Sequence, residues 1–439
     1  MNARMIIISL LAVFIVSWSS SASADVGSGI ALERLGLLSV HGSGARPFSM
    51  GNAYTSVSDD VFTLLFNPAG LARMTDNELS FGLDYTRREM GNTYLGTSVD
   101  QTGSYTSLGH LALAYPYPTY RGGLVFAFGI FRVGSSDLLS LRNGYLSEIP
   151  ATAQNVLTQS GNIYQYHIGL GVEISPRLSL GAGLVLWDES IDFTEEIIYE
   201  DPGSLAVYTD DVSLDMDGLS LNLGLMIRLL ENVDLGFLFT SPTWLSYYGE
   251  GVTNYEGTYF EGPYSGWTSD PFYGTIDEEY TLPMQLRGGI SARLAYLLLS
   301  ADVAYIDYSQ TKKNGQRLVD DLTPGRPNVL EAVWNLHAGA ELRVPDLPIR
   351  IRGGYAYMPL ALSTLEEIVF IENDELVAYV GDAEIVRDRH IISFGAGVVI
   401  DRVFELDAAF AFGSFERDTG YLVEEQKLTE ILLSGTYRF

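Results

Sequence analysis

Arginines recur at alternate positions within apolar segments of the sequence, and their guanidinium groups could bind an acidic ligand. Guanidinium and carboxylate groups match in two parallel hydrogen bonds, so clustered arginines could hold the head group of an otherwise apolar molecule. The candidates for this head-group binding are Arg228, Arg287, Arg350 and Arg352. Acidic residues interleave with them at Asp234, Asp302, Glu341, Glu405 and Asp407. Because buried charges need partners, this interleaving favours ion pairing inside the protein over ligand binding.

Other residue types that commonly do chemistry form no recognisable site. The sequence has five histidines and no cysteine, and no histidine is spaced with a nucleophile as a hydrolase requires. It contains neither an H-E-x-x-H segment nor a phosphate-binding glycine loop. The acidic residues between Glu195 and Asp217 match no calcium-binding loop, and a solvated acidic surface explains them better than cation bridges to lipopolysaccharide. We therefore predict no enzymatic activity, no metal site and no cofactor.

The composition excludes two further classes of protein. The 439 residues include 55 Asp and Glu against 26 Lys and Arg, which gives a formal net charge of −29. So acidic a chain is repelled by a phosphate backbone, and we predict no nucleic-acid partner. Charged residues make up 18% of the chain, which is too few for a disordered protein. Aromatic residues make up 12%, which is too many for one.

Apolar side chains occupy every second position over much of the chain, as in β-strands. In the segment 219–228, five aliphatic residues alternate with Ser220, Asn222, Gly224, Met226 and Arg228. The last segment, 427–439, alternates in the same way and ends in Tyr437 and Phe439. A soluble sandwich would also alternate. However, small residues and paired charges on the polar faces suit a lumen, and aromatic residues near the strand ends suit a membrane interface. We predict an all-β, transmembrane β-barrel.

The alternating segments number fourteen, an even number as expected of a single-chain barrel. We predict antiparallel strands at 79–90, 105–118, 120–136, 162–176, 177–200, 208–230, 233–255, 277–295, 296–312, 331–344, 347–363, 384–401, 403–418 and 427–439. Short turns alternate with long connections, which is the asymmetry between the periplasmic and outer ends of such barrels. The long connections include 91–104, 137–161, 256–276 and 364–383, the last of which could form a short helix or extend its strands.

The first 24 residues predict a secretory signal peptide. Arg4 precedes the apolar run 5–16, and Ala22-Ser23-Ala24 is a typical cleavage site. The apolar run has about a dozen residues, fewer than the ~20 that a membrane-spanning helix needs. We divide the chain into a signal peptide at 1–24, an N-terminal plug at 25–78 and a barrel at 79–439.

A long motif lies before the first predicted strand. Residues 43–72 read SGARPFSMGNAYTSVSDDVFTLLFNPAGLA, and this segment closely resembles the N-terminal signature of FadL-type outer-membrane hydrophobic-compound transporters and their PorV-like relatives. The resemblance implies a 14-stranded barrel whose N-terminal segment folds into the lumen as a plug, or hatch. It assigns the hatch motif to Asp59, Asp60, Asn67, Pro68, Ala69 and Gly70. The alternative is a static plug that only seals and braces the barrel.

The same resemblance implies a function and a location. Members of the family take up hydrophobic small molecules, such as long-chain fatty acids or aromatic hydrocarbons, which leave past the hatch or through a lateral gap in the wall. We therefore expect a passive channel in the cell outer membrane of a Gram-negative-type cell. Its expected partners are a hydrophobic small-molecule ligand, the lipid bilayer, lipopolysaccharide and the barrel assembly machinery. The alternative is a PorV-like outer-membrane scaffold for protein secretion or surface attachment.

Overall fold

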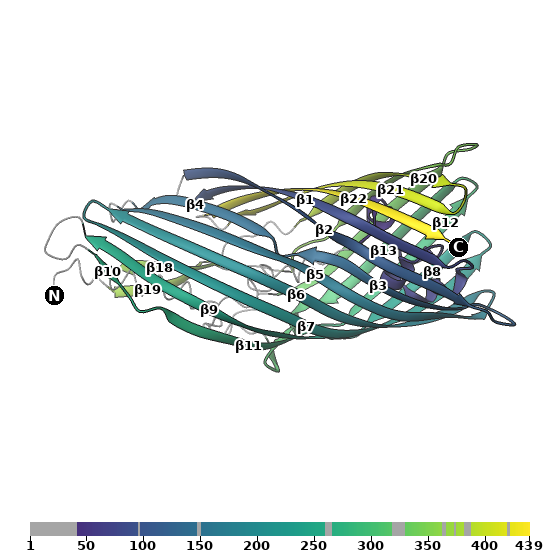
Figure 1. The fold of residues 1–439 in the computed structure, drawn as a ribbon, viewed down its shortest axis with the longest axis horizontal. Helices are drawn as coiled ribbons and strands as arrows, with labels where there is room; N and C mark the ends of the chain where they lie inside the picture. Colours follow the sequence, from purple (N-terminus) through teal and green to yellow (C-terminus); the bar gives the residue numbers. More distant parts are fainter. Residues whose placement is uncertain are drawn as a thin grey trace.

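A computed structural model shows a closed antiparallel β-barrel with a short helical segment inside one end (Figure 1). The structure describes residues 42–94, 97–146, 151–259, 266–317, 330–361, 366–372, 375–381, 388–418 and 422–439. The predicted signal peptide lies outside these residues. Strand β1 pairs with β2 on one side and with the last strand, β22, on the other, and this last pairing closes the barrel.

Fourteen strands form the wall, which confirms the predicted number. Three of them are interrupted once, so that β3 and β4, β8 and β9, and β11 and β12 each count as one strand. The wall strands are β1 (Glu78–Tyr94), β2 (Thr97–Tyr117), β3 (Leu124–Ser135), β4 (Leu138–Leu146), β5 (Ala151–Ser175), β6 (Leu178–Asp201), β7 (Ser204–Leu230), β8 (Val233–Thr240), β9 (Thr243–Tyr259), β11 (Phe272–Leu282), β12 (Gln285–Leu294), β13 (Leu297–Asp307), β16 (Ala332–Arg343), β17 (Ile349–Tyr357), β20 (His390–Ile400), β21 (Phe404–Asp418) and β22 (Leu422–Arg438).

Two of the interruptions lie side by side and contain proline. Pro242 separates β8 from β9, and Pro283 separates β11 from β12, the strand that pairs with them. Proline has no N–H to donate to the ladder, so it is tolerated where pairing breaks.

The wall places apolar side chains outside and small or polar side chains inside. On β2, Leu111, Leu113 and Tyr115 are exposed on the outer surface, whereas His110 and Ala112 are buried. The alternation continues on β22, where Leu433 and Tyr437 are exposed and Ser434 is buried. This arrangement confirms the sequence-based prediction, because successive side chains of a strand point to opposite faces.

Many strands run further than the sequence predicted. Most of the predicted long connection 137–161 belongs to β4 and β5, and most of 91–104 belongs to β1 and β2, so these two predictions were wrong. The predicted connection 256–276 contains the end of β9, the start of β11 and the short strand β10 (Trp267–Thr268). Beyond a membrane both faces of a strand meet water, so the alternation that marks a strand fades while its backbone pairing continues.

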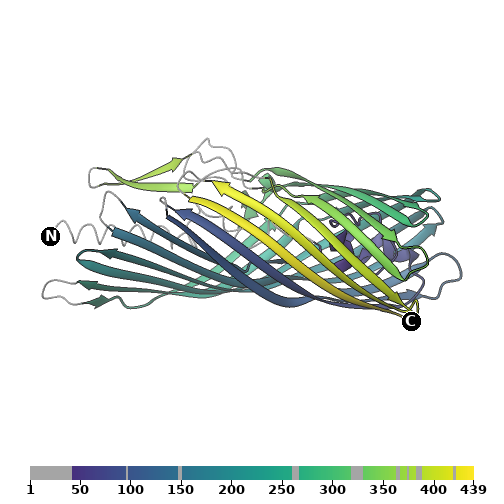
Figure 2. The same cartoon turned by 90° about the horizontal axis from the view of Figure 1, so that it is seen from above.

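The outer region also contains small hairpins. Strands β18 (Glu366–Glu372) and β19 (Glu375–Gly381) form a separate two-stranded sheet where the sequence left helix and strand open. It lies at the end of the barrel opposite the C-terminus (Figure 2). Strands β14 (Lys312–Lys313) and β15 (Gln316–Arg317) follow the turn η5 (Tyr308–Gln310) and pair beside β11.

Residues 42–77 form a plug inside the barrel at the end that holds the C-terminus (Figure 1). The plug contains α3 (Ala45–Ser49), α4 (Thr63–Phe66) and the 3-10 helix η4 (Pro68–Arg73). Apolar plug residues such as Met50, Tyr54 and Leu71 are fully buried and form one core with inward-facing wall residues. No helix in the described ranges is long and apolar enough to cross a bilayer.

Candidate functional site

The segment Asn67–Gly70 joins the plug to the wall. The Asn67 side-chain amide donates hydrogen bonds to the carbonyl oxygens of Thr55 (2.8 Å) and Leu225 on β7 (3.2 Å). Its oxygen accepts the N–H of Ala69 at 3.2 Å and caps η4, while Pro68 occupies the first helical position, where no N–H is needed. Asn67 therefore fixes two parts of the plug to one wall strand.

Wall glycines let the plug backbone lie directly on the strands. A Cβ atom at Gly181 of β6 would lie 2.2 Å from the Ala69 nitrogen. On another side of the plug, a Cβ atom at Gly354 of β17 would lie 2.0 Å from the Gly51 nitrogen. Atoms cannot approach so closely, so any side chain at these positions must move the plug or the strand.

We expect Gly181→Ala to loosen the plug. The added methyl group has backbone atoms in its way, and overpacking of this kind costs about 1–3 kcal/mol. Proteolysis within residues 43–72 of the purified protein should become faster, and the thermal unfolding temperature should fall. The matched control is Gly353→Ala, since a Cβ atom there meets nothing within 4 Å. Equal protease resistance of the two variants would contradict this account of the plug's seat.

Arg46 holds the plug through three carboxylates. Its guanidinium group forms a bidentate contact with Glu341 on β16, with distances of 2.8 and 3.2 Å. It also donates to Asp59 at 2.7 Å and to Asp60 at 2.9 Å. Tyr54 donates its hydroxyl to Asp60 at 2.5 Å, and its ring lies 5.7 Å from the guanidinium carbon. The buried guanidinium group of Arg46 thus contacts two aspartates of the plug and links them to Glu341 of the wall.

The two neighbouring aspartates of the hatch motif ionise differently. Burial would raise the pKa of Asp59, but the guanidinium groups of Arg46 and Arg293 outweigh burial and hold this pKa below its usual range. Burial raises the pKa of Asp60, opposed by Arg46 and reinforced by the negative charge of Asp59. Asp59 therefore stays ionised at lower pH than Asp60 does.

We expect acid to weaken the plug through Asp59. An unfolded aspartate has a pKa of about 3.9, and the folded pKa of Asp59 is lower, so its stabilisation is complete above that unfolded value. That stabilisation is lost as the pH falls from about 4 toward the folded pKa. Amide protection factors of residues 43–72, which are corrected for the slower intrinsic exchange in acid, should fall as the pH is lowered from about 5 to about 2. Asp59→Asn should remove most of this dependence; an unchanged pH profile in that variant would refute the assignment.

The four arginines predicted to bind a head group all contact carboxylates in the wall. Arg352 is buried and lies 2.8 Å from Glu341, 2.6 Å from Asp407 and 3.4 Å from Glu405. Arg350 lies 2.5 Å from Glu405. These contacts match the ion pairing that the sequence favoured. Arg352, Arg46 and their partners form one network at the plug end of the barrel.

The other two arginines lie apart from this network. Arg287 lies 3.0 Å from Asp302, whose same oxygen accepts the plug N–H groups of Tyr54 (2.8 Å) and Thr55 (2.9 Å). Arg228 is partly exposed and lies 3.8 Å from Asp234. Among the four predicted arginines, only Arg287 lines one of the two lumen cavities described below.

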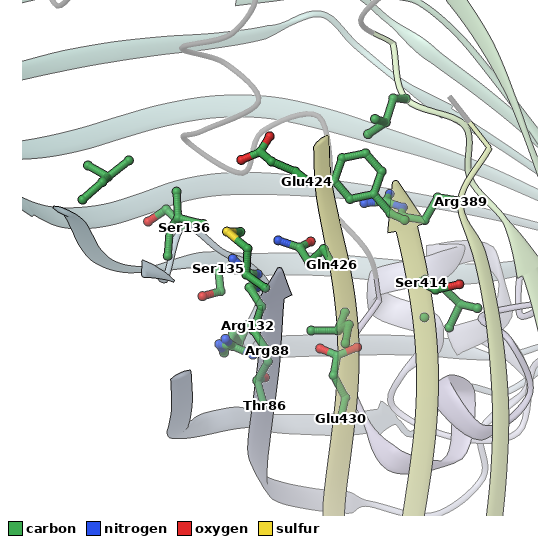
Figure 3. Close-up of a pocket in the computed structure, with 18 of the residues that line it drawn as sticks. Thr86, Arg88, Arg132, Ser135, Ser136, Arg389, Ser414, Glu424, Gln426 and Glu430 are labelled. Carbon is green, nitrogen blue, oxygen red and sulfur yellow. The ribbon is translucent and has the colours of Figure 1, made fainter. Parts of the chain in front are cut away.

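Two cavities lie in the lumen beyond the plug. The first has a volume of about 140 Å³ and lies between β1, the β3–β4 break, β21 and β22 (Figure 3). Its lining combines apolar side chains with arginines and a few acids: Met90, Leu138, Leu157, Leu360, Leu428, Arg88, Arg132, Arg142, Arg389, Glu424 and Glu430. The second, of about 160 Å³, touches the plug at Asn52 and Phe66 and is lined by aromatic, amide and apolar groups together with Arg287, Arg389 and His337. Both include Arg389, so they are neighbours.

The hydrogen-bonded ladder of the wall is interrupted beside the first cavity, and this unpaired stretch is called the opening below. The ladder between β2 and β3 ends at the pair His110 and Phe131, although β2 continues to Thr97. Beyond this point β3 and β4 remain paired with β5 only, with a bulge between Arg132 and Gly134. Asn92 of β1 donates to Ser140 and to the Leu141 carbonyl, so β4 lies against inward-facing side chains. The wall therefore has an interrupted ladder where the cavity meets it.

Sequence reasoning did not single out the arginines of this first cavity. Arg88, Arg132 and Arg142 come from segments whose alternation is weak or broken by the bulge, so their facing could not be assigned. The signal available was that three arginines fall close to these interruptions in a chain with few bases.

The architecture defines a class: a closed fourteen-stranded barrel, plugged at one end by its own N-terminal segment. No protein-family model and no curated protein matches the chain. Solved structures do, including the toluene transporter TodX of P. putida (TM-score 0.62, 16% identity, 91% of this chain and 99% of that chain). The CymD monoaromatic hydrocarbon channel matches with TM-score 0.59, 16% identity and coverages of 91% and 98%. A Pseudomonas aeruginosa FadL homologue matches with TM-score 0.58 and 14% identity, over 90% of this chain and 98% of that chain. This chain has the fold of the FadL-type channels, as the resemblance implied.

Proposed function

We propose that this protein is an outer-membrane channel for passive uptake of hydrophobic small molecules that carry an acidic head group, of the long-chain fatty acid type. The observation that carries this proposal is the first cavity, which combines an apolar lining with four arginines and lies beside the interrupted ladder. In a chain with twice as many acids as bases, a cavity lined by more arginines than acids is suited to an anion.

The fold supports this function in three ways. The exposed apolar belt suits a bilayer, so that strands present leucine and aromatic side chains to acyl chains. The plug closes the straight path through the barrel, which argues against a general diffusion pore. The opening beside the cavity supplies a path into the membrane for an apolar ligand, whose buried surface contributes about 25 cal/mol per Å². The similar channels are named for toluene and monoaromatic hydrocarbons, which carry no charge, so the acidic head group proposed here rests on the arginines of the first cavity.

The test is uptake of labelled decanoate and decanol by Gram-negative host cells that lack their own channel for such compounds. These probes share a chain length and differ in head group. Cells that express the protein should take up decanoate several-fold faster than cells with an empty vector. Arg142→Gln should slow decanoate more than decanol, since it removes a cavity-lining guanidinium group. If expression of the folded barrel leaves decanoate uptake unchanged, the proposed function is wrong.

A PorV-like scaffold for secretion or surface attachment is the second candidate. Strands β5, β6 and β7 have 25, 24 and 27 residues, well beyond the ~9–11 that cross a bilayer, so they form a tall wall on one side. Such a wall offers a surface for an exported protein. Unchanged uptake, together with a lost secreted protein on deletion of the gene, would favour this candidate. Under either proposal the barrel reaches the membrane through the barrel assembly machinery and contacts lipopolysaccharide.

A further inference from the structure

Arg132 occupies the opening in the wall. It follows Phe126, Phe128 and Ile130 at alternate positions of β3, so its side chain starts on the outer surface of the barrel. Phe126 and Phe128 are 45% and 43% exposed on that surface, but Arg132 is only 4% exposed. Arg132 is also one of the residues that line the first cavity (Figure 3). The side chain therefore passes from the outer face into the lumen.

The contacts of Arg132 span the wall from one face to the other. Its Nε donates to Asn162 Oδ1 at 2.6 Å, and Asn162 lies on the outer face of β5. Its Nη1 lies 3.9 Å from Asp84, a buried inward residue of β1, and its Nη2 lies 3.9 Å from Asp137. Asp84 and Arg132 come from strands on opposite sides of the interrupted ladder. Arg132 thus bridges the opening.

The ion pairs of the Arg132 guanidinium group with Asp84 and Asp137 are long. The contacts to Asp84 and Asp137 are both at 3.9 Å, whereas Arg352 in the plug network reaches its carboxylates at 2.6 and 2.8 Å. Ion pairs weaken with distance, and charge-assisted hydrogen bonds need about 2.7–2.9 Å. Asp137 is also engaged elsewhere, because it accepts from Ser135 at 2.5 Å and from the Gly161 N–H at 3.1 Å.

An acidic ligand in the first cavity would meet Arg132 directly. The cavity is also lined by Arg88 and Arg142, so a carboxylate entering it is attracted toward the inner side of the opening. A carboxylate at hydrogen-bond distance would bind the guanidinium group more tightly than two carboxylates at 3.9 Å do. A side chain with several rotatable bonds can follow such a partner into the lumen.

We propose that Arg132 is a ligand-operated bolt: at rest it closes the opening between β2 and β3, and the acidic head group of a ligand draws it inward and opens the wall. The bolt makes head-group charge a condition for lateral exit, which gives the channel its specificity. This inference rests on the proposed function for the identity of the ligand, while the closure of the opening by Arg132 stands on the wall geometry alone.

The first test compares decanoate and decanol uptake in Arg132→Ala, Arg132→Lys and wild type. Arg132→Ala should raise decanol uptake several-fold and bring the decanoate-to-decanol ratio toward one, because the opening no longer depends on the head group. Arg132→Lys keeps the charge and should stay near the wild-type ratio. Arg121→Ala is the control, since Arg121 is exposed in the turn before β3. An unchanged ratio in a correctly folded Arg132→Ala barrel would overturn the proposal.

The second test needs no transport. The chain has no cysteine, so Thr86→Cys places a single thiol in the first cavity, where Thr86 is buried. In proteoliposomes, the thiol of Thr86→Cys is labelled with a maleimide carried on a dodecyl chain. Labelling should be at least several-fold faster in the double variant Thr86→Cys, Arg132→Ala than in Thr86→Cys alone. In Thr86→Cys alone, added decanoate should also make labelling faster. Equal labelling with and without Arg132 would overturn the bolt even if uptake is confirmed. If Arg132→Ala makes labelling faster but the protein takes up no decanoate, the role of Arg132 in closing the opening is supported and the proposed function is wrong.

Discussion

Arg46→Met is expected to release the plug from the barrel. The substitution leaves Glu341, Asp59 and Asp60 together without their shared cation, and removal of one partner from a buried ion pair costs about 3–5 kcal/mol. Glu341 keeps its contact with Arg352 at 2.8 Å and Asp59 keeps Arg293 at 3.5 Å, but both are wall contacts, so the excess negative charge between plug and wall should drive the plug off the wall. Purified Arg46→Met should show an increased ion conductance in planar bilayers, together with fast proteolysis within residues 43–72.

A second substitution separates loss of charge balance from loss of shape. Adding Glu341→Gln to Arg46→Met removes one of the carboxylates that Arg46 balanced, so the double variant should recover part of the plug protection. Arg121→Met, at an exposed turn position, should behave as wild type. If Arg46→Met has wild-type conductance and protease resistance, the network around Arg46 does not hold the plug.

Gly413→Trp is expected to abolish uptake while the barrel still folds. Gly413 lines the first cavity from β21, and a Cβ atom there meets its nearest atom at 3.4 Å, which is an ordinary contact. The indole would then occupy space that the ligand needs. Decanoate uptake should fall roughly tenfold or more, a loss that corresponds to only about 1.4 kcal/mol of ligand binding.

The matched control adds the same side chain to the other face of the same strand. Phe412 lies on the outer surface of β21 and is about half exposed, so Phe412→Trp leaves the lumen unchanged. Both variants should run as folded barrels on unheated gels. Wild-type uptake through Gly413→Trp would show that ligands do not use the first cavity.

The wall could be predicted from the sequence because lipid imposes a strict alternation on every strand that crosses it. In the segment 219–226 the alternation places Leu219, Leu221 and Leu223 outside, where they are exposed, and the residues between them inside, where Ser220, Asn222 and Met226 are buried. The outer ends of β4 and β5 could not be predicted, since water on both faces removes the alternation. The plug could be recognised only through its resemblance to a known family, because its short helices have no period of their own.

The site depends on features that alternation cannot reveal. The alternation along β3 places Arg132 with Phe126 and Phe128 on the lipid-facing surface. Its side chain is buried instead, because the β2–β3 ladder ends beside it. Arg350 and Arg352 were correctly placed inside the wall, but which carboxylates they contact depends on strand register. Local pattern therefore predicts the face of a residue, whereas breaks in pairing decide which residues meet the ligand.

The most direct test of the central claim is to find where a ligand lies. Decanoate with a photoreactive diazirine near the end of its chain can be added to cells that express the protein and then cross-linked by light. Mass spectrometry of the digested barrel should find the adduct on lumen residues of the first cavity, such as Leu138, Leu157 and Leu428. Adducts confined to the outer apolar belt, at residues such as Phe81 or Leu433, would contradict uptake through the lumen.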